Sequence, residues 1–197
     1  MKNFKKAFLM VLCVVAIAGA SIFGTLAYLT STTGPVTNTF TVGNVAITLD
    51  EAPVDADGKE TTGERVYANA YDIFPGQTYD KDPTVHVDAN SEDCWLFVKV
   101  DNGIVDIEGD TKIVDQMATK GWTLVDGKTN IYAYKDIVTA DQDVVVFETF
   151  TIAGTVDNDT LATYSTAKII IEAYAVQAEG FATSAAAWTA APLAAWN

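Results

Sequence analysis

The side chains that could carry out catalysis are few in this sequence, and they form no recognisable catalytic motif. His86 is the only histidine among the 197 residues. A zinc-protease helix of the HExxH type needs two histidines one turn apart, so the sequence cannot form one. A Ser-His-Asp triad would have to use His86, and no serine lies in a nucleophile-elbow pattern. We therefore predict a protein that is not an enzyme and that binds no cofactor.

The 26 acidic residues are scattered through loop-like stretches, which is the distribution that solubility alone would produce. Paired acids from different strands could still meet in the folded chain, so glycoside hydrolysis stays open as an alternative. Residues 55–58, Asp-Ala-Asp-Gly, match half of a calcium-binding loop. The further oxygen ligands and the closing glutamate of such a loop are missing. We interpret the segment as a solvated turn, with a weak calcium site near Asp55 and Asp57 as the alternative.

The two cysteines predict a fold without an internal disulfide. Cys13 lies in an apolar N-terminal run, and Leu12 before it is atypical of a lipid-attachment site. Cys94 would be the only cysteine left after removal of that run, and it directly precedes an apolar stretch. We expect Cys94 to be buried as a small hydrophobic residue rather than to act as a reactive thiol.

The N-terminus has the three-part layout of a secretory signal peptide. Three lysines within the first six residues precede an uncharged run of apolar or small residues from 7 to 23. Small residues then lead up to a cut between Ala27 and Tyr28. We therefore predict that residues 1–27 are a signal peptide and that the protein is secreted. The apolar run is at the lower limit for spanning a bilayer, and an uncleaved membrane anchor is the alternative.

Cleavage after Ala27 would leave 170 residues, which suits one domain with a substantial core. It would also remove three of the 12 basic residues and none of the 26 acidic ones, giving a net charge of −17. Such an excess of negative charge argues against nucleic acid or an anionic membrane surface as a partner. We expect contact with a membrane only through the uncleaved signal.

The mature chain has the patterns of short strands separated by turn-rich loops. Hydrophobic and polar residues alternate over 45–50 and 84–88, which is typical of half-buried strands. In the second stretch we expect Val85 and Val87 to point inward and His86 to face solvent. Phe40 and Val42 alternate in the opposite phase to 45–50, so a bend is expected at Gly43. Further strands are predicted over residues 95–100, 122–125, 131–135, 144–152 and 168–177.

Two short helices are predicted. Residues 111–120 can form one that Gly121 closes, and the alanine-rich stretch 181–188 can form the other. The residues that would share one face of the second helix are Phe181, Ala185 and Trp188. We expect it to cover one open end of the core, and an exposed helix that binds a partner is the alternative.

About eight strands with turn signals every eight to twelve residues predict an all-β fold. We expect an antiparallel β-sandwich, jelly-roll-like, with one or two short helices, over residues 43–197. The predicted turns include Pro75-Gly76, residues 126–128 and Asn158-Asp159. Residues 28–42 would precede this domain as a polar, threonine-rich arm that Gly34-Pro35 interrupts.

Several segments resemble the family of TasA and camelysin, secreted proteins of Gram-positive bacteria. Residues 24–30 resemble the signal-peptide junctions that a SipW-type signal peptidase cleaves in that family, and the stretch Asn-Thr-Phe-Thr-Val-Gly-Asn-Val at 38–45 resembles the strand that follows. The other matching segments are 75–76, 81–85, 93–100, 173–181 and 187–188. Camelysin is classed as a metalloprotease, but this sequence departs from any recognisable zinc motif, and that activity is not carried over.

The resemblance implies a jelly-roll domain at the cell surface, where TasA-type members polymerise into biofilm matrix fibres. In such fibres the mature N-terminal segment can complete a sheet of the neighbouring subunit, and here that donor strand would lie within residues 28–42. The arm residues expected to take part are Tyr28, Leu29, Val36, Phe40 and Val42. A head-to-tail contact of this kind does not close on itself, so it yields a filament. Cleavage at Ala27 would free the arm for assembly.

We therefore expect a secreted structural protein that forms fibres of the extracellular or biofilm matrix. Its expected partners are copies of itself and a SipW-type signal peptidase, with an accessory matrix protein as a further candidate. A monomeric cell-surface binding or accessory matrix protein is the first alternative. A secreted metalloprotease-like hydrolase is the second.

Overall fold

The computed structural model describes residues 44–191, 193 and 196. The predicted signal peptide, the bend at Gly43 and the donor arm lie outside the described residues. The same holds for the individual cleavage and arm positions, which are Ala27, Tyr28, Leu29, Val36, Phe40 and Val42.

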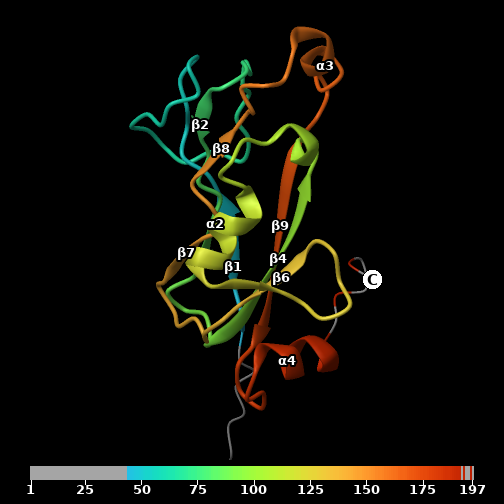
Figure 1. The fold of residues 1–197 in the computed structure, drawn as a ribbon. Helices are drawn as coiled ribbons and strands as arrows, with labels where there is room; N and C mark the ends of the chain where they lie inside the picture. The colour runs from blue at the N-terminus through green and yellow to red at the C-terminus, as the bar shows by residue number, and fades with distance from the viewer. Residues whose placement is uncertain (1–43, 192, 194–195, 197) are drawn as a thin grey trace, which may run out of the picture. The chain divides into compact units, whose positions relative to one another are not determined.

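Nine antiparallel strands form three sheets in the part of the chain that the structure describes (Figure 1). The three-stranded sheet has the order β1-β3-β7, with β1 at Ile47–Asp50, β3 at Thr84–Val87 and β7 at Asp143–Val145. The four-stranded sheet has the order β5-β6-β4-β9, with β5 at Trp122–Leu124, β6 at Ile131–Tyr134, β4 at Cys94–Asn102 and β9 at Ile169–Gln177. Strands β2 (Thr78–Asp80) and β8 (Thr149–Thr151) form a separate pair. The expected all-β, sandwich-like fold is confirmed.

Strand β4 is buried on both faces and separates two hydrophobic clusters. Leu96 and Val98 face the larger cluster, which lies against the three-stranded sheet. Trp95 and Phe97, which alternate with them, face a smaller cluster that contains Trp188. This alternation explains why the sequence of β4 is almost continuously apolar, as expected for a strand with no solvent face.

The predicted strand over 144–152 is wrong as a single element. The chain forms β7, leaves the three-stranded sheet, and then forms β8 as the partner of β2. Val146 and Phe147 lie between the two strands and are fully buried. The stretch is rich in apolar residues because Val146 and Phe147 fill the core where the chain passes between sheets, and periodicity alone cannot distinguish this from a long strand.

The described residues contain three short α-helices and one 3₁₀ helix, where one or two helices were predicted. Helix α2 is Ile113–Lys120, α3 is Asn158–Ala162, α4 is Ser184–Ala190, and the 3₁₀ helix is Val105–Ile107. None of them is long and apolar enough to cross a membrane. Gly121 ends α2 with a φ of +96°, as expected for a left-handed helix cap.

Helix α3 replaces the turn predicted at Asn158-Asp159. The Asp157 carboxylate accepts a hydrogen bond from the backbone N–H of Thr160 at 2.8 Å. An aspartate in this position satisfies one of the free N–H groups at a helix start, which favours one helical turn over an open loop.

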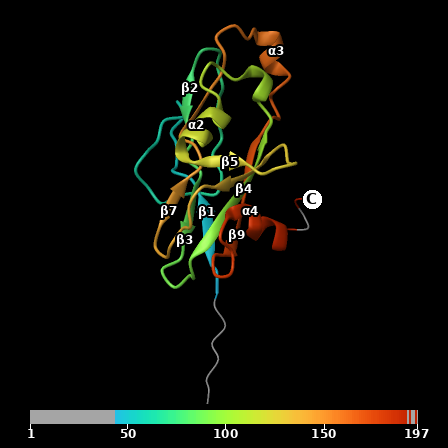
Figure 2. The ribbon, with the colours of Figure 1, turned by 60° about the horizontal axis from the view of Figure 1, so that its bottom comes forward.

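Helix α4 lies against the outer face of the four-stranded sheet, beside β4 and β9 (Figure 2), and not over an open end of the core. Its buried residues are Ala187 and Trp188, whereas Ala185 is exposed. The helix begins only at Ser184, where the Thr183 hydroxyl accepts a hydrogen bond from the N–H of Ala186 at 3.1 Å. Phe181 therefore lies outside the helix, and the predicted helical face was wrong.

Candidate functional site

Sheet edges are the structural feature that strand addition requires. Strand β9 is an edge strand of nine residues, paired on one side with β4 along its whole length, from Ile169 opposite Asn102 to Gln177 opposite Cys94 (Figure 1). An edge strand offers a row of backbone N–H and C=O groups to another chain. Strand β9 is therefore the longest edge strand in the described residues, and β1 lies close to part of it.

The side chains along this edge are apolar and only half-buried. The core-facing residues of β9 are partly exposed although they pack on the larger cluster; they are Ile169, Ile171, Ala173 and Ala175. Ile170, on the opposite face, is 48% exposed. Strand β1 is also an edge strand, and its residues Ile47 and Leu49 are partly buried in the same way.

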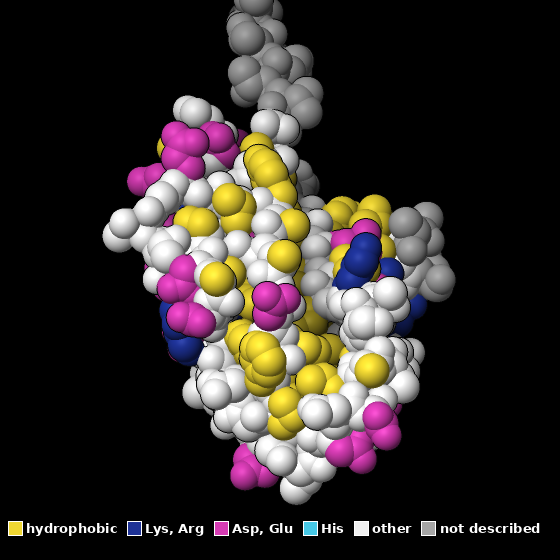
Figure 3. Space-filling view, turned by 90° about the horizontal axis from the view of Figure 1, so that it is seen from above, with side chains coloured by type: hydrophobic (Ala, Val, Ile, Leu, Met, Phe, Trp, Pro, Cys, Tyr) yellow, Lys and Arg dark blue, Asp and Glu magenta, His cyan; other side chains and the backbone are white. Residues whose placement is uncertain are grey.

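Hydrophobic side chains also reach the surface elsewhere. Figure 3 shows a face of the protein on which they gather in a band among polar and acidic side chains. The most exposed large hydrophobic residues are Tyr67 and Phe74, at 88% and 61%. Both lie in the loop between β1 and β2, which therefore presents two aromatic rings to the solvent.

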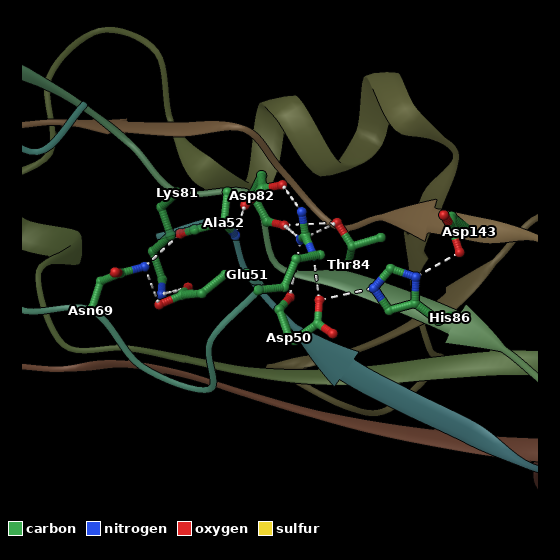
Figure 4. Close-up of polar contacts among 10 residues, drawn as sticks. Asp50, Glu51, Ala52, Asn69, Lys81, Asp82, Thr84, His86 and Asp143 are labelled. Atoms are coloured by element: carbon green, nitrogen blue, oxygen red, sulfur yellow. Dashed lines mark hydrogen bonds and ion pairs between the residues drawn. The ribbon is translucent and has the colours of Figure 1, made fainter. Parts of the chain in front are cut away.

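A polar network ties the end of β1 to β3 and to the following loop (Figure 4). Arg65 is its centre, and its guanidinium contacts one carboxylate oxygen of Asp50 and one of Asp82, the latter at 2.8 Å. Arg65 also donates to the Thr84 hydroxyl at 3.0 Å. The planar guanidinium holds several acceptors in fixed directions, so this residue fixes the loop 52–66 to the sheet.

The predicted solvent-facing residue His86 belongs to this network. It lies on the face opposite Val85 and Val87, as expected, and those two valines are buried. Its Nε2 is 2.8 Å from Asp50 Oδ1, and its Nδ1 is 2.6 Å from Asp143 Oδ1. A neutral imidazole has only one N–H, so only the protonated ring can donate to both carboxylates.

The electrostatics of the site follow from this arrangement. Burial alone would lower the pKa of His86, but the hydrogen bonds and charges of Asp50 and Asp143 outweigh burial and raise it above the usual 6.5. Burial alone would raise the pKa of Asp50, but Arg65 and His86 together lower it below 3.8. The site therefore favours an imidazolium between two carboxylates at mildly acidic pH.

We expect the stability of the protein to depend on the charge of His86. Because folding raises the pKa of His86, its charge contributes fully to the stability of the fold below pH 6.5, the usual pKa of histidine. This contribution is lost as the pH rises through the pKa of His86 in the folded protein. The lowered pKa of Asp50 acts in the other direction: its contribution is present above 3.8 and is lost as the pH falls through its folded value. Each of these two contributions to the free energy of unfolding should be below about 1 kcal/mol, because His86 and Asp50 are partly open to solvent.

Two measurements check this expectation. Nuclear magnetic resonance should give one set of histidine ring signals, since His86 is the only histidine, titrating above pH 6.5. In chemical unfolding, the stability of His86→Gln should no longer fall as the pH rises through the pKa of His86. Asp141→Asn, a change at a neighbouring aspartate, should still show that fall. A histidine that titrates below its usual value would contradict the assigned contacts.

A second group of charged side chains is buried beside this network. Glu51 and Lys81 are 4% and 8% exposed, and they form an ion pair. The Asn69 amide donates to the other oxygen of the Glu51 carboxylate at 3.0 Å. No spacing pattern links positions 51, 69 and 81, so the sequence alone does not indicate that these three residues meet.

The other two positions considered in the sequence, the possible calcium site at Asp55 and the thiol of Cys94, are both engaged within the fold. The Asp55 carboxylate accepts hydrogen bonds from the N–H groups of Asp57 and Lys59, both at 2.9 Å, which is a turn that Asp55 caps itself. In the described part of the chain, no group of three or more His, Cys, Asp or Glu side chains could hold a metal ion. Cys94 is fully buried, as expected, and burial raises the pKa of its thiol to about 11.

The alternative of glycoside hydrolysis requires acidic side chains from different segments to meet. Asp50 and Asp82 do meet, but both carboxylates are bound by the guanidinium of Arg65. The Thr84 hydroxyl beside them donates to the Asp82 backbone carbonyl at 2.7 Å. The arrangement can therefore hold three segments together, and none of its groups is placed as an activated nucleophile.

No family model, curated protein or solved structure matches the chain.

Proposed function

We propose that this protein is a secreted structural subunit of extracellular or biofilm matrix fibres, and that its subunits assemble by strand addition. The observation that carries the proposal is the nine-residue edge strand β9, whose core-facing apolar side chains are only partly buried. A strand from another subunit would pair with this backbone and cover these side chains.

The sequence supplies a segment that suits this role. Residues 28–42 precede β1, and their extended length of roughly 50 Å is enough to reach a neighbouring subunit. Phe40 and Val42 alternate with Thr39 and Thr41. In a strand added to β9, one pair would lie on the core-facing side of the sheet and the other on the opposite side, and we assign the core-facing side to Phe40 and Val42. The resemblance to TasA and camelysin supports the same reading, with assembly beginning when cleavage at Ala27 frees the arm.

A monomeric cell-surface binding protein is the second candidate. The observation that favours it is the pair of exposed rings, Tyr67 and Phe74, in the loop between β1 and β2. Exposed aromatic side chains are common at binding surfaces. This function predicts a protein that stays monomeric and binds a partner to saturation.

Electron microscopy of the protein starting at Tyr28, beside one starting at Gly43, tests the proposal. We expect filaments from the longer protein and none from the shorter one. Replacing Phe40 and Val42 by lysine should also abolish filaments, because the charges would have to lie beside the apolar core-facing side chains of β9. Replacing Thr39 and Thr41 by lysine is the matched control and should leave filaments intact. Single particles from every version, over a range of protein concentration and pH, would overturn the proposal and favour the binding protein.

A further inference from the structure

The buried residues Glu51 and Lys81 and the partly buried Asn69 form a group in which an amine and an amide meet the same carboxylate (Figure 4). Lys81 Nζ contacts Glu51 Oε2, and Asn69 Nδ2 donates to Glu51 Oε1 at 3.0 Å. Figure 4 shows Lys81 and Asn69 both pointing at Glu51 from different segments. One carboxylate therefore binds both the amine of Lys81 and the amide of Asn69.

The three segments are fixed by backbone hydrogen bonds. Glu51 exchanges two bonds with Val66, at 2.8 and 2.7 Å, which brings the segment that carries Asn69 alongside the end of β1. Lys81 donates its backbone N–H to Glu148 at 2.9 Å. The group is therefore built into the fold and does not depend on flexible surface side chains.

The asparagine is oriented by every polar atom of its side chain. Its Oδ1 accepts a hydrogen bond from the Val54 N–H at 3.2 Å, and its Nδ2 donates to the Ala52 carbonyl at 2.8 Å as well as to Glu51. The N–H on Oδ1 polarises the amide carbonyl and would stabilise negative charge that develops on that oxygen. The carboxylate on Nδ2 is placed where a leaving nitrogen must receive a proton.

Aromatic rings lie next to the group. Tyr71 packs against Phe150 with ring centroids 5.0 Å apart and against Tyr79 at 6.0 Å. Burial, followed by the charge of Glu51, raises the pKa of the Tyr71 hydroxyl. Glu51 and Lys81 are themselves 4% and 8% exposed, so little water reaches the contact between them.

We propose that Lys81 and Asn69 are joined by an intramolecular isopeptide bond, with Glu51 as the group that carries the protons. The inference stands apart from the proposed function, because the bond forms within one domain whether or not subunits assemble. It assigns a covalent modification site to Lys81 and Asn69, which meet at the buried carboxylate of Glu51.

The reaction balances without any further reagent. The Lys81 ammonium gives a proton to Glu51, and the neutral amine attacks Cγ of Asn69. A new C–N bond forms, the bond from Cγ to Nδ2 breaks, and Glu51 gives its proton to Nδ2, which leaves as ammonia. Glu51 then takes the second proton from the attacking nitrogen and passes it to the ammonia, which becomes an ammonium ion. The overall change converts a lysine ammonium and a primary amide into a secondary amide and an ammonium ion. No group is oxidised or reduced.

Peptide mapping of the unaltered full chain is the direct test. An endoprotease that cuts before aspartate separates Asn69 from Lys81 at Asp72 and at Asp80. We expect a branched peptide that contains both residues and weighs about 17 Da less than its two parts, the mass of one ammonia. A succinimide at Asn69 would lose the same mass but would not join two peptides. Separate, unlinked peptides in full yield, from fresh and from long-incubated protein, would overturn the proposal.

Variants identify the role of each residue. Lys81→Arg and Asn69→Ala should give no branched peptide, because each removes one of the bonded atoms. Glu51→Gln keeps the shape of the side chain and should slow bond formation at least tenfold. Lys59→Arg, at a lysine whose side chain is 50% exposed, is the matched control and should retain the link. A Glu51→Gln protein that is linked as fast as the unaltered one would overturn the role given to Glu51.

Discussion

Replacing Trp122 by alanine is expected to lower the free energy of unfolding by about 3–5 kcal/mol, the range for large core aromatics. Trp122 is 1% exposed, and its ring lies 5.2 Å from that of Tyr134. Its indole N–H donates to the carbonyl of Val145 at 3.0 Å, so a residue of β5 in the four-stranded sheet bonds directly to β7 in the three-stranded one. The substitution would open a cavity between the sheets and leave that carbonyl without its partner.

Chemical denaturation followed by circular dichroism measures this effect. Trp122→Phe keeps most of the ring but removes the N–H, so it should cost less than the alanine change and isolate the bond to Val145. Leu124→Ala, at a residue of the same strand that is 52% exposed, is the surface control and should change stability by less than about 1 kcal/mol. A Trp122→Ala protein as stable as the Leu124→Ala protein would contradict the packing of the two sheets.

The second large effect is expected at the C-terminal helix. Trp188→Ala should lower the free energy of unfolding by about 3 kcal/mol, because the ring packs on the outer face of the four-stranded sheet. Its centroid lies 5.1 Å from that of Phe97 and 6.3 Å from that of Trp196, and Lys128 Nζ lies 6.0 Å from it. Truncation would therefore uncover Phe97, which is fully buried in the intact protein.

The same denaturation experiment distinguishes a packed helix from one that is free to bind a partner. Ala185→Ser lies on the exposed side of α4 and should change stability by less than about 1 kcal/mol. Faster proteolysis within residues 184–190 of Trp188→Ala would show that the helix has detached. If Trp188→Ala and Ala185→Ser were equally stable, the helix would contribute little to the core, and its role as a partner-binding element would be favoured again.

The sequence patterns that correctly predicted secondary structure and burial are local ones. Alternation over 84–88 placed Val85 and Val87 in the core and His86 on the opposite face, as the structure has them. Gly121 after an amphipathic stretch marked the end of α2, because a left-handed cap is a property of one residue and the turn before it. Residues 168–177 were recognised as a strand because β-branched residues dominate their first half.

Local patterns failed where the chain changes partners. The run over 144–152 is rich in β-branched and aromatic residues, yet its two ends pair with β3 and with β2 in different sheets. The start of α4 depended on the cap at Thr183, so the helical face predicted from Phe181 was displaced. In both cases the sequence correctly indicates that these residues are largely apolar. Their spacing does not indicate which sheet or helix face they pack against.

The sequence by itself determined that this is an all-β chain with a strand-like core, a strong negative charge and no recognisable catalytic motif. Only the tertiary structure decided that Arg65 joins Asp50 to Asp82, that His86 lies between two carboxylates, and which charged residues are buried. It also decided that Glu51, Asn69 and Lys81 meet at one carboxylate. The physical reason is that periodicity reports which face of a strand is buried, whereas contacts between distant segments depend on strand register and loop path, which no local spacing encodes.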